Sequence, residues 1–339
     1  METALLVNIA EALQGGSTGK YEWYTQKLAD LGKLNAKNRA TIQLYIEQLG
    51  AAIDEEMRAS LLTHLDSVDS VYAQAGVTQS VNNNTIYALI DAYVKSSAGV
   101  ANYTGENMLG VSRQAYIDII TTAQNEVLSG TKSTRQAVKD VLKKWADKGL
   151  IMPGNDTGLI DKGGRTWQAD SYVSMQIRTA STAAYRELTT ARNEQYGNDL
   201  IEISSHLGAR PGCAPYQGKV YSQFGKNPRF PAFSTTTFGE AAGLFGVNCR
   251  HIMYPFIEGA STQRYNPIDE ARNAESYKLS QQQRKLERDI RKTKRDVLVL
   301  DKLGEDTTEA SAKVRAKQQA MRDFIEETGR TRLRDREQI

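Results

Sequence analysis

The stretch Asp199-Leu200-Ile201-Glu202-Ile203-Ser204-Ser205-His206 divides the chain, because helical spacing of apolar residues stops there and β-like alternation begins. Lys219-Val220-Tyr221-Ser222 is a second short candidate strand. Turn-forming residues lie around and beyond it: Pro211-Gly212, Gln217-Gly218, Gly225, Pro228, Pro231, Gly239, Gly243 and Gly246. A segment this rich in turns buries little apolar surface in regular layers, so we predict a small α+β module over 199–260 that packs onto the rest of the chain or is held by a staple.

The sequence before this module, residues 1–198, has the spacing of helices. Apolar residues recur at steps of three and four from Lys20 to Leu49, with a break expected at Asn35 to Asn38. The pattern continues from Ile53 to Val71, and the run Asn82-Asn83-Asn84 is expected to start a new element. His64 shares a helical face with leucines and is predicted to be structural or merely exposed.

Further signals place the later helices of this region. Ser133 is a predicted N-cap, and Gly149 ends the pattern that it opens. Glycines, a proline and aspartates predict a loop from Met152 to Gly164, after which helical spacing resumes from Trp167 to Tyr196.

Residues 261–339 form a charged tail. A thin apolar stripe runs beneath the charges and predicts a long amphipathic helix suited to one partner helix: Leu279, Leu286, Ile290, Val297 and Leu300. A second helix is predicted from Ser311 to Thr328. The predicted fold is therefore mainly α with a small turn-rich α+β module, divided into a helical domain (1–198), the module (199–260) and a charged helical tail (261–339).

Composition excludes several classes of protein. With 40% hydrophobic and 24% charged residues, 26 Gly, 7 Pro and 2 Cys among 339 residues, the chain is neither collagen-like nor a disulfide scaffold. No apolar run approaches the roughly 20 residues that span a bilayer, and the start of the chain lacks the basic region of a secretory signal. We therefore expect no membrane association and synthesis in a reducing cytoplasm. The net charge of +3 neither requires nor excludes a nucleic-acid partner.

The histidines and cysteines are concentrated in the module. His206 and Cys213 are followed by Cys249-x-His251, and two nitrogen and two sulfur ligands suit a tetrahedral structural zinc ion. The spacing is not that of a zinc finger, so inert thiols and hydrogen-bonded histidines remain the alternative. A disulfide between the two cysteines is not expected in a reducing compartment.

An enzymatic role is not predicted. His206 could act as a general base with Arg210 and Arg250 holding an anion, but no local signature supplies a nucleophile or a second acid or base. The glycine-rich stretch at 238–243 lacks the Gly-Lys-Ser ending of a phosphate-binding loop.

A basic cluster in the tail is a candidate contact for nucleic acid or for a protein partner. It comprises Arg284, Lys285, Arg288, Arg291, Lys292, Lys294 and Arg295, against only Glu287 and Asp289. A solvated helix face is the alternative. We expect a protein partner, because acids reappear at Asp296, Asp301 and Glu305.

Four separated blocks resemble the core motifs of the phage minor capsid protein type 2 family, which is similar in kind to the Mu F-like head morphogenesis proteins. The blocks are Ser205-His206-Leu207-Gly208-Ala209-Arg210-Pro211, Tyr216-Gln217-Gly218-Lys219-Val220-Tyr221-Ser222, Gly243-Leu244-Phe245-Gly246-Val247-Asn248-Cys249-Arg250-His251 and Tyr254-Pro255-Phe256-Ile257-Glu258-Gly259. Beyond the candidate ligands, the motif core comprises Arg210, Gln217, Gly218, Asn248 and Arg250. The charged helix that follows, 283–295, also resembles that family, in which position 213 is often His and position 245 often Cys.

The resemblance implies a structural component of a tailed-phage virion. It implies a low-copy protein in the phage head near the portal vertex, assembled in the host cytoplasm with portal protein, major capsid protein or scaffold, and carried inside the head or ejected with the DNA. It supplies no catalytic mechanism. Two rival functions remain: a zinc-stabilised DNA-binding or DNA-processing virion protein, and a virion-carried toxin-type enzyme.

Overall fold

The computed structural model describes residues 1–16, 19–77, 81–150 and 167–339. Its contacts divide the chain into two compact units. Unit 1 comprises Met1–Glu47, Asn102–Tyr172 and Gln281–Ile339, and unit 2 comprises Gln48–Ala101 and Val173–Ser280. The division into 1–198, 199–260 and 261–339 stays a prediction, and the predicted loop at 152–164 lies outside the described residues.

The predicted fold class is confirmed: helices dominate, and a small sheet lies between α6 and α7 in the sequence. The helices are α1 (Glu2–Leu13), α2 (Lys20–Ala52), α3 (Arg58–Gln74), α4 (Asn84–Leu128), α5 (Thr134–Lys148), α6 (Ala169–Tyr196), α7 (Glu270–Leu303) and α8 (Thr308–Thr328), with a π-helical turn, Ile53–Met57, between α2 and α3. The strands are β1 (Leu200–Ile203), β2 (Val220–Ser222) and β3 (Met253–Pro255). Among the described residues, none of the helices combines the length and apolar character that crossing a membrane requires.

The predicted helix ends at α5 are confirmed by their hydrogen bonds and backbone angles. The Ser133 side chain accepts a hydrogen bond from the Gln136 N–H, and Gly149 ends the helix at φ 80°. The expected break at Asn35 to Asn38 is wrong, because α2 continues through it. Asn38 is buried, accepts from Asn8 Nδ2 at 3.0 Å and donates to Ser112 Oγ at 3.1 Å. Asn38, which the sequence pattern placed in a helix break, thus forms tertiary hydrogen bonds from within a continuous helix.

Unit 1 has a helical core. Buried apolar side chains come from α1, α2, α4, α5, α7 and α8, including Leu5, Ile9, Trp23, Ile42, Tyr116, Ile119, Leu142, Ile290 and Met321. Gly105 of α4 allows a close approach to α2, since a Cβ there would lie 2.7 Å from side-chain carbons of both Ile42 and Ile46. This glycine therefore sets the distance at which the two helices pack.

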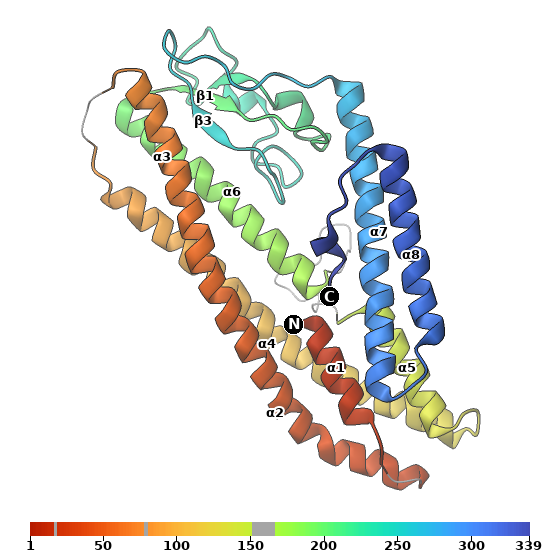
Figure 1. The fold of residues 1–339 in the computed structure, drawn as a ribbon. Coiled ribbons are helices and arrows are strands. Elements are labelled where there is room, and N and C mark those ends of the chain that lie inside the picture. The colour runs from red at the N-terminus through yellow and green to blue at the C-terminus, as the bar shows by residue number, and fades with distance from the viewer. Residues whose placement is uncertain (17–18, 78–80, 151–166) are drawn as a thin grey trace. The chain divides into compact units, whose positions relative to one another are not determined.

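Helix α7 receives its partner helix from its own chain. The helix α8 runs antiparallel beside it (Figure 1), and Lys317 Nζ lies 3.4 Å from the Asp289 carboxylate. Two members of the apolar stripe, Ile290 and Leu300, are buried, whereas Leu279, Leu286 and Val297 are partly exposed. Part of the stripe is therefore buried within the chain, and three of its residues keep some exposed surface.

Unit 2 combines a helical core with the small sheet. Its helical core gathers Ile53, Met57, Leu61, Leu65, Ile86, Ile90, Val94, Ala184 and Leu188. In the antiparallel sheet, ordered β2-β1-β3, every residue of β1 is buried. The two predicted strands are confirmed, whereas β3 escaped prediction because three residues ending in proline carry no clear alternation.

Candidate metal centre and partner surfaces

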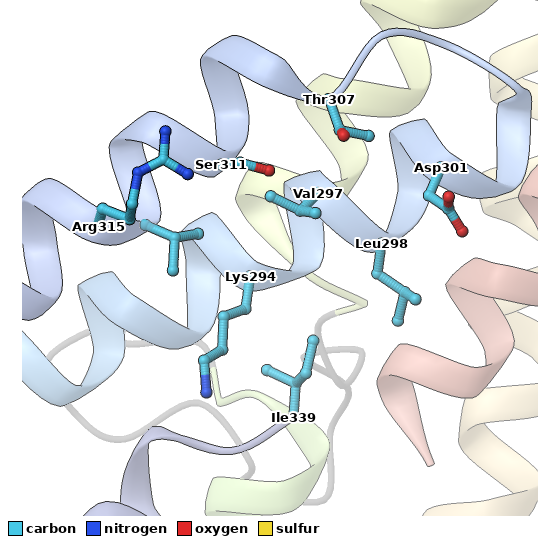
Figure 2. Close-up of a pocket in the computed structure, with 9 residues that line it drawn as sticks. Lys294, Val297, Leu298, Asp301, Thr307, Ser311, Arg315 and Ile339 are labelled. Atoms are coloured by element: carbon cyan, nitrogen blue, oxygen red, sulfur yellow. The ribbon is translucent and has the colours of Figure 1, made fainter.

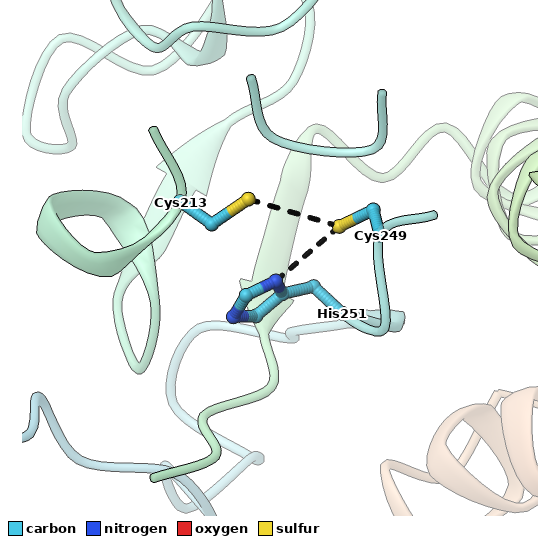
Figure 3. Close-up of side chains that lie close together, drawn as sticks. All are labelled: Cys213, Cys249 and His251. Carbon is cyan, nitrogen blue, oxygen red and sulfur yellow. Dashed lines mark hydrogen bonds between the residues drawn. The ribbon is translucent and has the colours of Figure 1, made fainter. Parts of the chain in front are cut away.

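Three of the four predicted metal ligands meet in the core of the module (Figure 3). Cys213 precedes a short 3-10 turn, and Cys249 and His251 lie in the loop that leads into β3. Cys213 Sγ and Cys249 Sγ are 4.0 Å apart, and Cys249 Sγ is 3.3 Å from His251 Nδ1. One donor atom from each residue lies within 4.8 Å of the other two, and all three residues are at most 2% exposed.

Each sulfur receives a hydrogen bond from a nitrogen outside the cluster. Arg210 Nε donates to Cys213 Sγ at 3.3 Å, and the Phe245 N–H donates to Cys249 Sγ at 3.2 Å. The Arg210 guanidinium also donates to the carbonyls of Gly243 and Val247, each at 2.6 Å. One arginine thereby fixes both the Cys213 sulfur and the loop that leads to Cys249.

Gln217 orients the imidazole of His251. Its Oε1 lies 3.1 Å from His251 Nε2 and also accepts the His206 backbone N–H at 2.9 Å. Because an amide oxygen only accepts, the Nε2 atom carries the proton and donates it. The lone pair of Nδ1 therefore faces the sulfur of Cys249.

The fourth predicted ligand, His206, lies beside this cluster. Its ring stacks on that of His251, with ring centroids 4.5 Å apart and planes inclined by 29°. Its Nε2 atom is buried and has no hydrogen-bond partner among the described residues, and its nitrogens are not part of the compact three-donor group. Burial lowers the pKa of the His206 imidazole, and the nearby His251 acts in the same direction.

The two thiols have opposite electrostatic character. The hydrogen bond that Cys213 donates lowers the pKa of Cys249 below its usual value. The same sulfur–sulfur bond, together with burial, raises the pKa of Cys213. The pair thus favours one thiolate, on Cys249, and one thiol, on Cys213.

The remaining motif residues shape the loops around the cluster. Gly218 has φ 66°, and a Cβ there would lie 2.3 Å from the backbone of Asn266, so only glycine fits. Asn248 has φ 61° and ties its loop to α6: its N–H donates to Thr179 Oγ1 at 3.0 Å, and its Oδ1 accepts from Arg178 at 2.6 Å. Arg250 is exposed and lines, with residues of α6, a cavity of 520 Å³.

Sequence reasoning missed Asn273, which holds the loop after β1. Asn273 lies in the first turn of α7 and is 3% exposed. Its Oδ1 accepts the N–H groups of Gly208 and Ala209 at 2.9 and 3.0 Å, and its Nδ2 donates to the Ala209 carbonyl at 2.8 Å. An asparagine in a charged helix gives no periodicity signal, so only the tertiary structure reveals this role.

Most of the predicted basic cluster on α7 has partners within unit 1. Lys292 pairs with Asp147 at 3.4 Å, Lys294 Nζ donates to Gln338 Oε1 at 3.0 Å, and Arg291 donates to the Arg336 carbonyl. Lys285 and Arg288 are exposed, and Arg284 is partly exposed.

The sequence prediction that Arg295 belongs to a contact surface is wrong. This residue is 5% exposed, and its guanidinium lies 3.5 Å from the buried Glu2 carboxylate. An internal ion pair replaces the external contact, because this face of α7 meets α1.

A groove of 490 Å³ runs between α7 and α8 (Figure 2). Both apolar and polar side chains line the groove, and the C-terminal residue is one of them. The lining residues are Lys294, Val297, Leu298, Asp301, Thr307, Ser311, Val314, Arg315 and Ile339. The part of the apolar stripe that α8 leaves open, at Val297, faces this groove.

Comparison with known proteins gives a consistent result. The sequence model of the family described as phage minor capsid protein 2 matches residues 1–326. A structural protein of Lactococcus phage LL-H is 27% identical over 332 residues, which covers 93% of this chain and 88% of that protein. A structural protein of Lactococcus phage mv4 is 34% identical over 116 residues, covering 33% of this chain and 94% of that protein. No solved structure matches.

Proposed function

Because the chain belongs to the phage minor capsid protein 2 family, we propose that it is a head component that associates with the portal and the major capsid protein during assembly. The family match from residue 1 to residue 326 carries this proposal, since it includes both units and the module. The relatives in two phages are named structural proteins, which supports residence in the virion.

The groove between α7 and α8 is the surface that we assign to this association. It exposes apolar side chains, including Val314 and the C-terminal Ile339, the latter 45% exposed. Charged groups of both signs flank them, as at Asp301 and Arg315. An apolar floor with a polar rim is the usual composition of a protein-binding surface.

A protein partner is favoured over DNA by the way the basic cluster is used. Lys292, Lys294 and Arg295 already interact with groups of their own chain. A DNA contact would require those charges to face phosphates. The zinc-stabilised DNA-binding protein is therefore the second candidate, and it would use exposed basic residues such as Lys285 and Arg288.

We propose no catalytic role for the cluster in the module. Cys249 and His251 lie at a distance that suits a nucleophile and its base. However, they are only 2% and 1% exposed, which disfavours access of a substrate to the sulfur. This burial also speaks against the toxin-type enzyme.

Co-expression with the portal protein tests the association directly. We expect the tagged chain to retain the portal in the absence of other phage proteins, and purified particles to contain the chain in low copy number. Absence of the chain from particles purified through a density gradient would contradict its role in the virion.

A charge placed in the groove tests the surface. We expect Val314→Glu to abolish capture of the portal, because a carboxylate would be buried at the contact. Ala316→Glu, at an exposed position of the same helix, is the matched control and should leave capture intact. Equal capture by both variants at unchanged melting temperature would remove the groove from the proposal.

A further inference from the structure

We propose that Cys213, Cys249 and His251 bind one structural zinc ion, with His206 as the fourth ligand. The inference concerns the interior of the module and does not rest on the proposed role in the phage head. Four observations carry it: the spacing of the donor atoms, the contacts behind them, the unpartnered nitrogen of His206 and the construction of the module.

Two of the three separations between donor atoms match those around a tetrahedral zinc ion. With Zn–S bonds of about 2.3 Å and Zn–N bonds of about 2.0 Å, tetrahedral geometry separates two sulfurs by about 3.8 Å and a sulfur from a nitrogen by about 3.5 Å. The observed separations are 4.0 Å between the sulfurs and 3.3 Å between Cys249 Sγ and His251 Nδ1. Thiolate and imidazole donors together select zinc over the oxygen-seeking cations.

The contacts behind the donors are those that metal ligands require. A ligating histidine usually donates its second ring N–H to a fixed acceptor, and Gln217 Oε1 provides that acceptor for His251 Nε2 at 3.1 Å. The Nδ1 atom is left with its lone pair toward the sulfurs. Arg210 and the Phe245 N–H donate to the two sulfurs, and such donors would stabilise the two thiolates that a zinc ion requires.

His206 supplies a nitrogen that nothing else in the described structure uses. Its Nε2 atom is buried without a hydrogen-bond partner, and a buried polar atom in this state requires a physical explanation. The ring already stacks on His251, 4.5 Å away between centroids. A movement of this side chain toward the sulfurs would close the site and satisfy the nitrogen.

The module is built in a way that gains from such a link. Its strands have three or four residues, and its apolar core is small: Ile201, Ile203, Cys213, Tyr221, Phe233, Leu244, Phe245, Cys249 and Met253. Cys213 and Cys249 are 36 residues apart in the sequence. An ion between them would add a direct link between two loops that hydrogen bonds from Arg210 already connect, and its binding free energy would add to folding.

Metal content of the full-length protein, purified without chelator, is the first test. We expect about one zinc ion per chain, as for a single four-ligand site. Removing the metal with a chelator should lower the melting temperature, and adding zinc should restore it. Folded protein with less than about a tenth of that zinc, and no change on adding the metal, would leave a hydrogen-bonded thiol–imidazole core and overturn the proposal.

Point variants assign the ligands. Cys249→Ser and His251→Asn should each lose at least tenfold in zinc affinity, whereas His64→Asn should keep full occupancy. His64 is the matched control because it is a buried histidine of the same unit that lies outside the cluster. Equal zinc loss in the control would show that general destabilisation causes it, which would count against the assignment.

Cobalt substitution tests the fourth ligand without relying on variant stability. The Co(II)-loaded wild-type protein should show sulfur-to-cobalt charge transfer and the intense visible bands of a tetrahedral site. We expect His206→Asn to retain the charge-transfer band and to change the visible bands, because water or asparagine replaces a nitrogen. An unchanged spectrum and unchanged zinc affinity in His206→Asn would exclude His206 as a ligand.

Discussion

Two regions of the chain bury polar groups in opposite ways. The module and the first turn of α7 bury neutral groups such as Gln217 and Asn273, which hydrogen-bond backbone and side chains of nearby loops. The later part of α7, in unit 1, instead buries charged groups, and Glu287 Oε1, Arg295 Nε and Asp296 Oδ1 have no hydrogen-bond partner among the described residues. Hydrogen bonds between neutral groups therefore hold the loops of the module, with His206 Nε2 as an exception, whereas the α7 interface depends on the balance of buried charges.

The largest expected effect comes from breaking the buried ion pair. Arg295→Ala removes the guanidinium that pairs with the Glu2 carboxylate, which is 1% exposed, and should destabilise unit 1 by about 3–5 kcal/mol. Tryptophan fluorescence during urea unfolding measures this, since Trp23, Trp145 and Trp167 all belong to unit 1.

The control for this variant is Lys292→Ala, which removes the exposed pair with Asp147 and should cost less than about 1 kcal/mol. The double variant Glu2→Gln/Arg295→Met should recover much of the loss. Similar destabilisation by Arg295→Ala and Lys292→Ala would show that the buried ion pair of α7 contributes no more to stability than the exposed one.

The second effect is the acid sensitivity of unit 2. Burial lowers the pKa of His64 to about 4, against 6.5 in the unfolded chain, and its Nε2 contacts Tyr185 O and Thr189 Oγ1. Between these values the unfolded state binds more protons, so stability falls as the pH falls through this window. We expect a loss of about 2 kcal/mol between pH 7 and pH 5 in the unfolding transition that circular dichroism detects and tryptophan fluorescence does not.

His64→Asn removes the titrating group and should flatten this dependence. A transition equally acid-sensitive in the wild type and in the variant would assign the effect to other groups.

The third effect is a pH dependence of the stability of unit 1, and its sign is opposite to that expected for unit 2. Burial raises the pKa of Asp296 to about 6, against 3.8, and the nearby Asp147 adds to the shift while Lys143 and Lys292 oppose it. The folded state now binds more protons in this window, so stability rises as the pH falls. Tryptophan-detected unfolding should show a gain of about 1 kcal/mol between pH 7 and pH 5, absent in Asp296→Asn. A loss of stability in the wild type over that range would contradict the comparison.

The smallest expected effect concerns the exposed charges of α7. If Lys285 and Arg288 alone contact phosphates, the logarithm of DNA affinity should fall with the logarithm of salt concentration at a slope of about −1.8, from about −0.9 for each contact. We expect weak binding, lost in Lys285→Ala/Arg288→Ala, as measured by fluorescence anisotropy on duplex DNA. A slope steeper than about −3, from more than three contacts, would favour DNA as the partner.

Local signals explain what was predictable about the secondary structure and the ligands. Ser133 and Gly149 acted through their own backbone preferences, so the ends of α5 were visible in the sequence. The change from period 3.6 to period 2 near residue 200 located β1 and the start of the module. The crowding of cysteine and histidine identified three side chains that do meet in space, Cys213, Cys249 and His251.

Only the tertiary structure determined which residues become the partners of buried polar side chains. Whether Asn38 breaks a helix or bridges three of them depends on Asn8 and Ser112, which are distant in the sequence. The exposure of Arg295 depends likewise on Glu2. Periodicity reports which face of a helix is apolar, but a buried polar group is specified by partners that the fold brings together, and its free energy depends on whether they are present.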